Sequence, residues 1–509
     1  MNTHAPLNAQ DDGSKNSRRG GPGHGSDGNG NGSSSNNNES ALYRRVWRWH
    51  FYAGLVCLPF LILLAVTGGL YLFKDPIEHW IYRPLLTVDV KPGQPLSAEA
   101  LVDRAMAAQP GTAVRFVSPA APGRSAEVGI QTSSKTVVAV YMDPIDGRVL
   151  GEVADASRLM TVIKHLHSLA LAGKIANLWI EVVAGWAMVL VVSGLFLWWP
   201  RGRSGGVLSV RGQPRQRLWW RDLHAVTGCV AAAAILFLAV TGMPWSAFWG
   251  EQFGRLTSTW GVGTPRYVWG GAPPSTLPLA GLPEVPWSSS QAALPRSTSG
   301  GHEGHEHHEG HEAHQGQEQQ VPVAAPPASA GAAGAARSLN LDQALQIFAR
   351  MGLPAGTPVR LPSGPQGVYS AMRFPDDVRD VRVVHLDRYS GAVLADIGLK
   401  DYGAAGRLTE WGISLHTGRQ FGLLNQLLML AGCLSIVVLA VSSVVMWWKR
   451  RPRGRLAAPP RRAGDQAAVG AVVVAALLGL LYPLLGASML VALLVDTLLP
   501  GRWRQRFGL

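Results

Sequence analysis

The chain has 509 residues, of which 47% are apolar and only 16% are charged. Several uncharged apolar runs reach the roughly 20 residues that a helix needs to cross a bilayer. The net charge of +13 gathers in short segments beside those runs, so it indicates membrane lipid as a partner and no nucleic acid. The three cysteines lie inside apolar runs and form no disulfide framework, zinc motif or C-x-x-C-H motif.

Four apolar runs are predicted to span the membrane as helices. They are residues 43–73, 161–200, 223–250 and 416–448. The N-terminal tail, 1–42, is rich in Gly, Asn and Ser and is expected to be disordered. Two arginine-rich connections, 201–222 and 449–465, are expected in the cytoplasm, because short basic segments stay there. This pattern predicts a multi-pass membrane protein with a cytoplasmic N-terminus.

The two long loops, 74–160 and 251–415, would then face outward. Each has an amphipathic helix pattern, at 98–108 and 341–351, and then two short β-rich runs around a turn, which is a hairpin signal. Each loop is therefore predicted to form a small α+β domain. The second loop also contains a segment rich in Pro, Ala, Gly and His, 270–336, which is expected to be a disordered insertion.

The apolar stretch at 466–499 is harder to interpret, because Pro483 interrupts it. Basic residues flank it on both sides, so both ends are expected in the cytoplasm. A hairpin bent near Pro483 satisfies that condition, although each arm is short for a full span. A single kinked helix is the alternative, and the sequence leaves both open.

The second half of the chain repeats the first. The hairpin pattern at 141–150 recurs at 385–394, and histidines recur at matched distances from Thr-Gly pairs and Trp-Trp pairs. The predicted unit is a helix, an outward α+β domain and a second helix. Two units in the same membrane orientation imply a pseudo-two-fold axis along the bilayer normal, and such repeats place functional sites at their shared interface.

Four histidines occupy equivalent helix ends in the two units. His50 and His224 begin the first and third spans, whereas His167 and His416 begin the second and fourth at the other membrane face. The symmetry pairs His50 with His224 and His167 with His416. Neutral imidazole is a standard axial ligand of haem iron, so we expect two b-type haems stacked across the membrane. The alternative is four interfacial polar residues copied by duplication.

Two further residues compete for a role. His165 lies beside His167 on the same segment, but the second repeat has Ser414 at its place, which favours His167 as the ligand. Glu181 lies near the outer end of the second span. A role in proton or quinol chemistry is one interpretation of this acid, and an interfacial carboxylate that reaches the membrane surface is the other.

A histidine-rich run in the long insertion forms a second candidate site. Imidazole and carboxylate clusters bind Zn²⁺, Ni²⁺ or Cu²⁺, and a solvated low-complexity linker is the alternative. The candidate metal ligands are His302, His305, His307, His308, His311 and His314.

Eight short motifs carry a family resemblance that covers most of residues 42 to 500. They are Trp49-His50, Thr67-Gly68-Gly69-Leu70-Tyr71, Leu166-His167-Ser168-Leu169, Gly194-Leu195-Phe196-Leu197-Trp198-Trp199-Pro200-Arg201, Arg221-Asp222-Leu223-His224, Thr241-Gly242-Met243-Pro244-Trp245, Leu415-His416-Thr417-Gly418 and Met446-Trp447-Trp448-Lys449-Arg450. Together they resemble the PepSY-associated transmembrane family, often described as iron-regulated membrane proteins. Ser443 departs from the family pattern, because the other three spans have Gly at its place.

This resemblance implies periplasmic PepSY domains on a bacterial inner-membrane bundle. It also implies a di-haem ferric-siderophore reductase, an oxidoreductase that reduces Fe³⁺ held by a siderophore or another chelate. The haem-ligand role carries over to His50, His167, His224 and His416. The chain has no P-loop and no dinucleotide-binding motif, so a separate electron donor, quinol or a cytosolic reductase, is expected. The rival functions are a haem-free PepSY binding or regulatory protein and a metal-siderophore permease.

Overall fold

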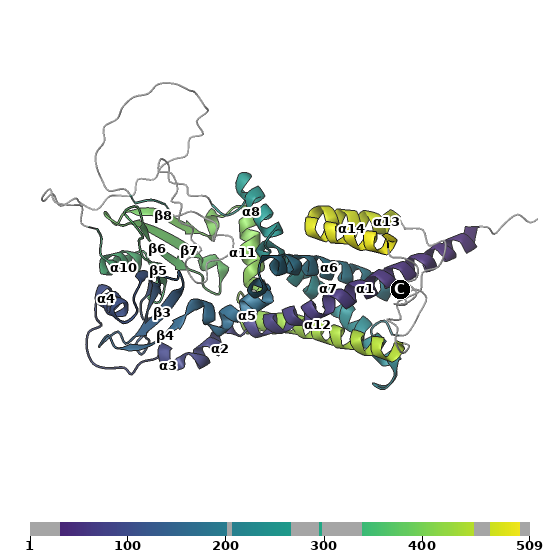
Figure 1. The fold of residues 1–509 in the computed structure, drawn as a ribbon, viewed down its shortest axis with the longest axis horizontal. Coiled ribbons are helices and arrows are strands. Elements are labelled where there is room, and N and C mark those ends of the chain that lie inside the picture. The colour runs from purple at the N-terminus through teal and green to yellow at the C-terminus, as the bar shows by residue number, and fades with distance from the viewer. Residues whose placement is uncertain (1–30, 201–205, 266–294, 298–337, 452–468, 499–509) are drawn as a thin grey trace, which may run out of the picture.

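The computed structural model describes residues 31–200, 206–265, 295–297, 338–451 and 469–498. It combines a bundle of long apolar helices with a domain built on one β-sheet at one end of that bundle (Figure 1). Within the described residues, four helices are long and apolar enough to cross a membrane. The chain is therefore a membrane protein.

The four spans lie close to their predicted positions. They belong to α1 (Asn31–Tyr71), α6 (Lys174–Trp198), α7 (Arg217–Gly242) and α12 (Leu423–Arg450). Helix α1 packs on α6 and α12, and α7 packs on the same two helices, which closes a four-helix bundle. Most of the predicted disordered tail, residues 1–30, lies outside the described residues, and its last part needs correction because α1 begins at Asn31. Once a helix is nucleated, each further residue adds a backbone hydrogen bond.

The predicted spans 161–200 and 416–448 are each broken into two helices. A short helix, α5 (Leu159–His167), precedes α6, and α11 (Ala404–His416) precedes α12. Gly173 and Gly422 immediately precede α6 and α12, and both have positive φ angles, of 95° and 59°. Glycine adopts this conformation without the steric cost of a side chain. Because of these breaks, His167 and His416 end the short helices and are not part of the spanning helices that follow.

The strands of both long loops form one antiparallel sheet, in the order β4-β3-β2-β1-β5-β6-β7-β8. The strands are β1 (Thr112–Val117), β2 (Ala126–Gln131), β3 (Val137–Met142), β4 (Val149–Ala154), β5 (Pro358–Arg360), β6 (Val368–Arg373), β7 (Arg382–Asp387) and β8 (Val393–Gly398). Both predicted hairpins are confirmed, as β3–β4 and β7–β8. The expectation of two separate α+β domains is corrected, because β1 and β5 pair directly, with Phe116 opposite Val359.

Two amphipathic helices pack together beside this sheet, α4 (Ala98–Ala108) and α10 (Leu341–Arg350). Both were predicted from their sequence patterns. Each helix has an acidic side chain that accepts a hydrogen bond from a backbone N–H at the start of the other helix. Asp342 accepts a hydrogen bond from the Ala98 backbone N–H at 2.7 Å, and Glu99 accepts one from the Leu341 N–H at 3.3 Å. The buried apolar side chains of both helices and both sheet halves form one continuous core.

Short elements lie between the spans, the short helices and the strands. They are α2 (Lys74–Ile81), α3 (Arg83–Leu86), α8 (Trp249–Thr259), and the 3₁₀ turns η1 (Asp155–Ser157), η2 (Ala170–Ala172), η3 (Met243–Trp245), η5 (Val378–Asp380) and η6 (Leu399–Asp401).

The C-terminal apolar stretch forms a helical hairpin of α13 (Val469–Leu481) and α14 (Pro483–Leu498), which pack against each other. Its two arms approach so closely at Gly479 that a Cβ added there would lie 2.9 Å from the Gly486 Cα. The hairpin docks on α6, where Trp186 donates a hydrogen bond to the Ser488 hydroxyl. Of the two open interpretations, the structure therefore has the hairpin. Neither arm reaches the length of a full span.

Glu181 is buried between α6 and the start of α8, with only 2% of its surface exposed. Its Oε2 accepts hydrogen bonds from the backbone N–H groups of Phe248 and Trp249, at 3.1 and 3.0 Å. Backbone N–H groups at the start of a helix lack intrahelical partners, and a carboxylate satisfies them. The interpretation of Glu181 as a carboxylate that reaches the membrane surface is therefore wrong.

Candidate functional site: two histidine pairs

His167 and His416 lie at the end of the bundle nearest the sheet domain, at the last positions of α5 and α11. The His167 Nδ1 lies 2.9 Å from the Thr67 hydroxyl of α1. The His416 Nδ1 lies 2.8 Å from the Thr241 hydroxyl of α7. We call these two histidines the domain-side pair. Each short helix is thus tied to a long helix by a hydrogen bond to its terminal imidazole.

His50 and His224 lie on α1 and α7, each 17 residues before the threonine of the same helix that contacts a domain-side histidine. The His50 Nδ1 lies 2.8 Å from the Ser193 hydroxyl of α6. The His224 Nδ1 lies 3.0 Å from the Ser442 hydroxyl and 3.2 Å from the Leu439 carbonyl oxygen, both of α12. We call these two histidines the far-side pair.

Each pair brings together one histidine from each half of the chain. The rings of His50 and His224 have their centres 6.4 Å apart and their planes perpendicular. In the domain-side pair, His167 and His416 contact threonines at equivalent places on α1 and α7. The indole of Trp245 stacks on the His416 ring, with the ring centres 6.4 Å apart. The structure therefore brings His50 and His224 together, and it places His167 and His416 at equivalent positions at the domain end of the bundle.

Glycines next to the hydroxyl residues give the imidazoles room. A Cβ added to Gly68 would lie 3.3 Å from the His167 Cε1, and one added to Gly194 would lie 3.3 Å from the His50 Cε1. At Gly242 the corresponding distance to the His416 Cε1 is 3.7 Å. Three of the four histidines thus contact a pair of consecutive residues. The first provides a hydroxyl next to Nδ1, and the second is a glycine next to Cε1.

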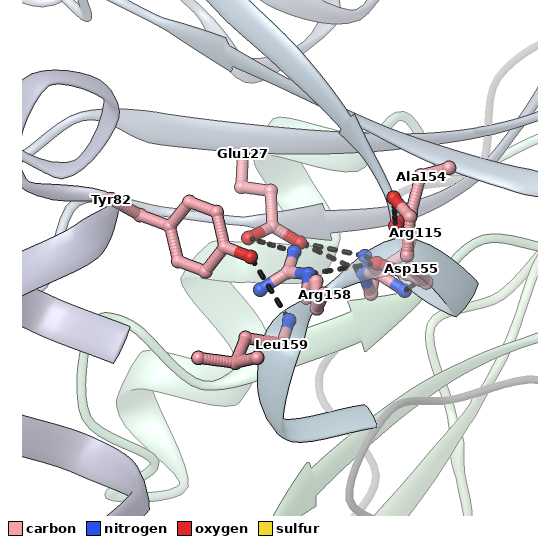
Figure 2. A network of polar contacts seen from close by, with 8 residues as sticks. Tyr82, Arg115, Glu127, Ala154, Asp155, Arg158 and Leu159 are labelled. Atoms are coloured by element: carbon pink, nitrogen blue, oxygen red, sulfur yellow. Dashed lines mark hydrogen bonds and ion pairs between the residues drawn. The ribbon is translucent and has the colours of Figure 1, made fainter. Parts of the chain in front are cut away.

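A network of buried charges holds the start of α5, the helix that ends in His167 (Figure 2). Arg115 of β1 forms ion pairs with Glu127 at 2.7 Å and with Asp155 at 2.8 Å. Arg158, the residue before α5, also pairs with Glu127. The Tyr82 hydroxyl accepts a hydrogen bond from the first backbone N–H of α5.

Glu127 is the centre of this network. Its burial alone would raise the pKa of its carboxyl, but the charges of Arg115 and Arg158 hold that pKa below its usual range. The Arg115 side chain is only 1% exposed. A buried charge of this kind is stable only with well-placed partners, so the network fixes α5 to the sheet.

Helix α11, which ends in His416, is held by hydrogen bonds from residues at and just after its end. The Ser414 hydroxyl donates to the Asp376 carbonyl oxygen, and Gln420 donates to the Asp377 carboxylate. The Gln420 side-chain oxygen accepts from the Val378 backbone N–H at 3.0 Å. The two short helices are therefore anchored to the domain by different residues, although both present a histidine at the same place.

The other histidines considered as ligands are His165 and the histidine-rich run. His165 makes no hydrogen bond to a spanning helix within the described residues, whereas His167 does. The six histidines of the run His302, His305, His307, His308, His311 and His314 lie outside the described residues. In the described residues, no cluster of three or more His, Cys, Asp or Glu side chains could hold a metal ion. That search does not cover the histidine-rich run, which lies outside the described residues. It also does not cover a metal that is held by only two histidines.

The histidine pairs suit a group that takes one imidazole on each side. With metal–nitrogen bonds of about 2 Å, two imidazoles on opposite sides of one metal have their ring centres roughly 6 Å apart. The 6.4 Å between the His50 and His224 rings fits this spacing. Within the described residues, each hydrogen bond of the four rings is made through Nδ1. The spacing of His50 and His224 thus fits haem iron with two axial histidines.

Comparison with protein families decides what kind of membrane protein this is. The model of the PepSY-associated TM region matches residues 47–450. The chain belongs to this family. The match to the PepSY-associated TM region includes all four paired histidines and both halves of the sheet. A comparison with curated proteins finds no match.

The sequence marked these histidines but did not reveal their partners. Thr67 and Thr241 stood out only as markers of the repeat, and so did the serines at 193 and 442. A threonine in a span usually bonds to its own helix, so their contact with imidazole depends on how the helices pack. The recurrence of a hydroxyl residue in all four spans was the available signal.

Proposed function

We propose that this chain is a di-haem b-type electron-transfer protein of a bacterial inner membrane. His50 and His224 would hold one haem, and His167 and His416 the other. The observation that carries the proposal is the contact between the rings of His50 and His224, which come from different halves of the chain, together with the equivalent placement of His167 and His416 at the other end of the bundle. Bound haem would supply one-electron redox chemistry. The protein would supply axial ligation and a largely apolar site.

The two pairs are separated along the bundle. His50 and Thr67, which holds His167, both lie on α1. The helical rise of 1.5 Å per residue places their Cα atoms about 25 Å apart. The hydrocarbon core of a bilayer is about 30 Å thick. Electrons that pass from one pair to the other would therefore cross most of the membrane.

The distribution of basic residues suggests the direction. Arg44, Arg45 and Arg48 lie just before His50, and Lys449 and Arg450 end α12 at the same end of the bundle. Short basic segments face the cytoplasm. The far-side pair would then lie near the cytoplasm, and the sheet domain would be periplasmic. Electrons would leave from the domain-side pair, next to the sheet.

A ferric chelate is the proposed acceptor. One electron reduces Fe³⁺ to Fe²⁺, which siderophores hold more weakly, so the metal is released. The chain would then act as a ferric-siderophore or other ferric-chelate reductase. Its donor would be quinol or a cytosolic reductase. That donor would lose one electron for each iron that is reduced.

The first test is a dithionite-reduced minus oxidised visible spectrum of the purified chain, with a pyridine haemochrome count. We expect the sharp bands of low-spin b haem at about two haems per chain. A featureless spectrum from protein produced with ample haem would overturn the proposal. A haem-free PepSY regulatory protein or a permease would then remain.

The acceptor is tested separately. Anaerobic, pre-reduced protein is mixed with a ferric siderophore, and the haem bands are followed. We expect reoxidation with the ferric chelate and none with the matching gallium chelate, which has the same charge and shape but is not reduced. Haem that stays reduced with ferric chelates would disprove the substrate and leave the electron-transfer role intact.

A further inference from the structure

The hydroxyl partners of the histidines have already used their own hydrogen atoms. The Thr67 hydroxyl lies 2.6 Å from the Leu63 carbonyl oxygen, one helical turn earlier. The Thr241 hydroxyl lies 2.6 Å from the Phe237 carbonyl oxygen. A carbonyl oxygen only accepts, and a hydroxyl has a single hydrogen. At 2.6 Å that hydrogen lies between the two oxygens, so neither threonine can also donate to imidazole.

The far-side pair follows the same rule. The Ser193 hydroxyl lies 2.6 Å from the Val189 carbonyl oxygen, so it too presents only a lone pair to His50. His224 contacts the Leu439 carbonyl oxygen directly, at 3.2 Å, in addition to the Ser442 hydroxyl. A carbonyl cannot donate, so this contact independently requires a hydrogen on the His224 Nδ1.

The hydrogen positions therefore follow from the heavy atoms. Each Nδ1 faces an acceptor, so each Nδ1 carries the hydrogen. A neutral imidazole has one N–H and one bare nitrogen, which leaves the lone pair on Nε2. All four histidines are thus fixed in the one tautomer in which Nε2 can bind a metal. The opposite tautomer would place two lone pairs face to face at every site.

We propose that Thr67, Ser193, Thr241 and Ser442 are positioning residues that fix the tautomer and orientation of the haem-ligand histidines. This inference rests on the proposed function. Partners that accept a hydrogen bond from a ligand imidazole also raise its basicity, and they are as much a part of a metal site as the ligands. The helix carbonyls orient the hydroxyls, the hydroxyls orient the imidazoles, and at three of the four sites an adjacent glycine leaves the ring room.

The test compares Thr67→Val with Thr67→Ser. Valine keeps the shape of threonine but removes the acceptor, whereas serine keeps the hydroxyl. Ser435→Ala is the matched control, because the Ser435 hydroxyl bonds to the Ala431 carbonyl oxygen in the same way and faces away from the bundle interior. The readouts are the midpoint potential and electron paramagnetic resonance spectrum of each haem, and the affinity of the apoprotein for haem.

We expect Thr67→Val to shift the potential of one haem to a more positive value, because a less basic imidazole stabilises ferric iron less. Haem affinity at that site should fall roughly 10- to 100-fold. Thr67→Ser and Ser435→Ala should match the wild type. If Thr67→Val loses the haem completely, retention by Thr67→Ser supports the assignment.

Two results would overturn it. One is a Thr67→Val protein with unchanged potentials, spectra and haem affinity, and the other is a Thr67→Ser protein that behaves like Thr67→Val. Wild-type protein that binds no haem would instead disprove the proposed function, so the two failures can be told apart.

Discussion

The imidazole rings of His50 and His224 have their centres 6.4 Å apart and their planes at 90°. One ring comes from the first half of the chain and the other from the second. Neither half can form this pair alone. Mutations in α1 and α7 should therefore affect one common site, even though these helices are far apart in sequence.

Single alanine substitutions should sort the histidines into the two pairs. We expect His50→Ala and His224→Ala to remove the same haem or leave it five-coordinate, and His167→Ala and His416→Ala to affect the other. Haem counts and low-temperature spectra of purified variants measure this. His165→Ala is the control and should keep both haems. A variant that keeps both its haem content and the six-coordinate low-spin spectrum of the wild type would disprove the ligand role of that histidine.

The glycines beside the rings should tolerate no added methyl group. A Cβ at Gly68 or Gly194 would lie 3.3 Å from an imidazole carbon, which is tighter than an ordinary contact, so the ring must shift. We expect alanine at either position to lower haem affinity or broaden the spectrum of the adjacent haem. Gly54→Ala is the control, because its added carbon would meet only Leu190, at 3.9 Å. Equal behaviour of all three variants would contradict this account.

Removal of Arg115 should destabilise the sheet domain. Its side chain is 1% exposed and pairs with Glu127 and Asp155. Loss of one partner in a buried ion pair costs about 3–5 kcal/mol, so Arg115→Met should lower the melting temperature clearly. Arg379→Met is the control, because the Arg379 side chain is 71% exposed and exposed pairs contribute about 1 kcal/mol or less. Similar melting temperatures for both variants would refute a structural role for the network.

The buried acid Glu410 should make stability depend on pH. Burial raises the pKa of its carboxyl from 4.5 to about 8, against the opposing charge of Arg419. The folded protein then holds a proton that the unfolded chain releases, so stability is present below pH 4.5 and falls as pH rises towards 8. Glu410→Gln should remove this fall and add up to a few kcal/mol at pH 8.5.

Thermal unfolding in detergent at pH 5 and pH 8.5 measures the effect. The matched control is Glu251→Gln, which changes a half-exposed acid paired with Arg255. Its stability difference from the wild type should be small at both pH values. A Glu410→Gln protein with the wild-type pH dependence would show that Glu410 is ionised in the folded state.

The C-terminal hairpin predicts that both of its ends lie on one side of the membrane. Cysteines placed just before Val469 and just after Leu498 should react with the same membrane-impermeant reagent, added from the cytoplasmic side. The turn next to Pro483 should be protected, because Tyr482 and Leu485 are buried against the bundle. Labelling of the two ends from opposite sides would instead require a single kinked span.

The features set by local sequence could be predicted, and those set by packing could not. The spans follow from uninterrupted apolar length, and the β3–β4 and β7–β8 hairpins follow from short-range turn signals. The pairing of β1 with β5 joins segments from different halves of the chain, and no local pattern specifies which strand edges meet. Glu181 was misread for a similar reason, because its partners lie on α8 and are distant in sequence.

The sheet has a consequence for how such a chain could arise. Its order is symmetrical about the β1–β5 junction, and every histidine pair takes one member from each side of that symmetry. A polypeptide with only one repeat would have an unpaired central strand edge and one half of each pair. Two copies of it, joined edge to edge as a homodimer, would rebuild the whole arrangement. Gene fusion would then have freed the two halves to diverge, as Glu181 in the first half and the hairpin after the second half illustrate.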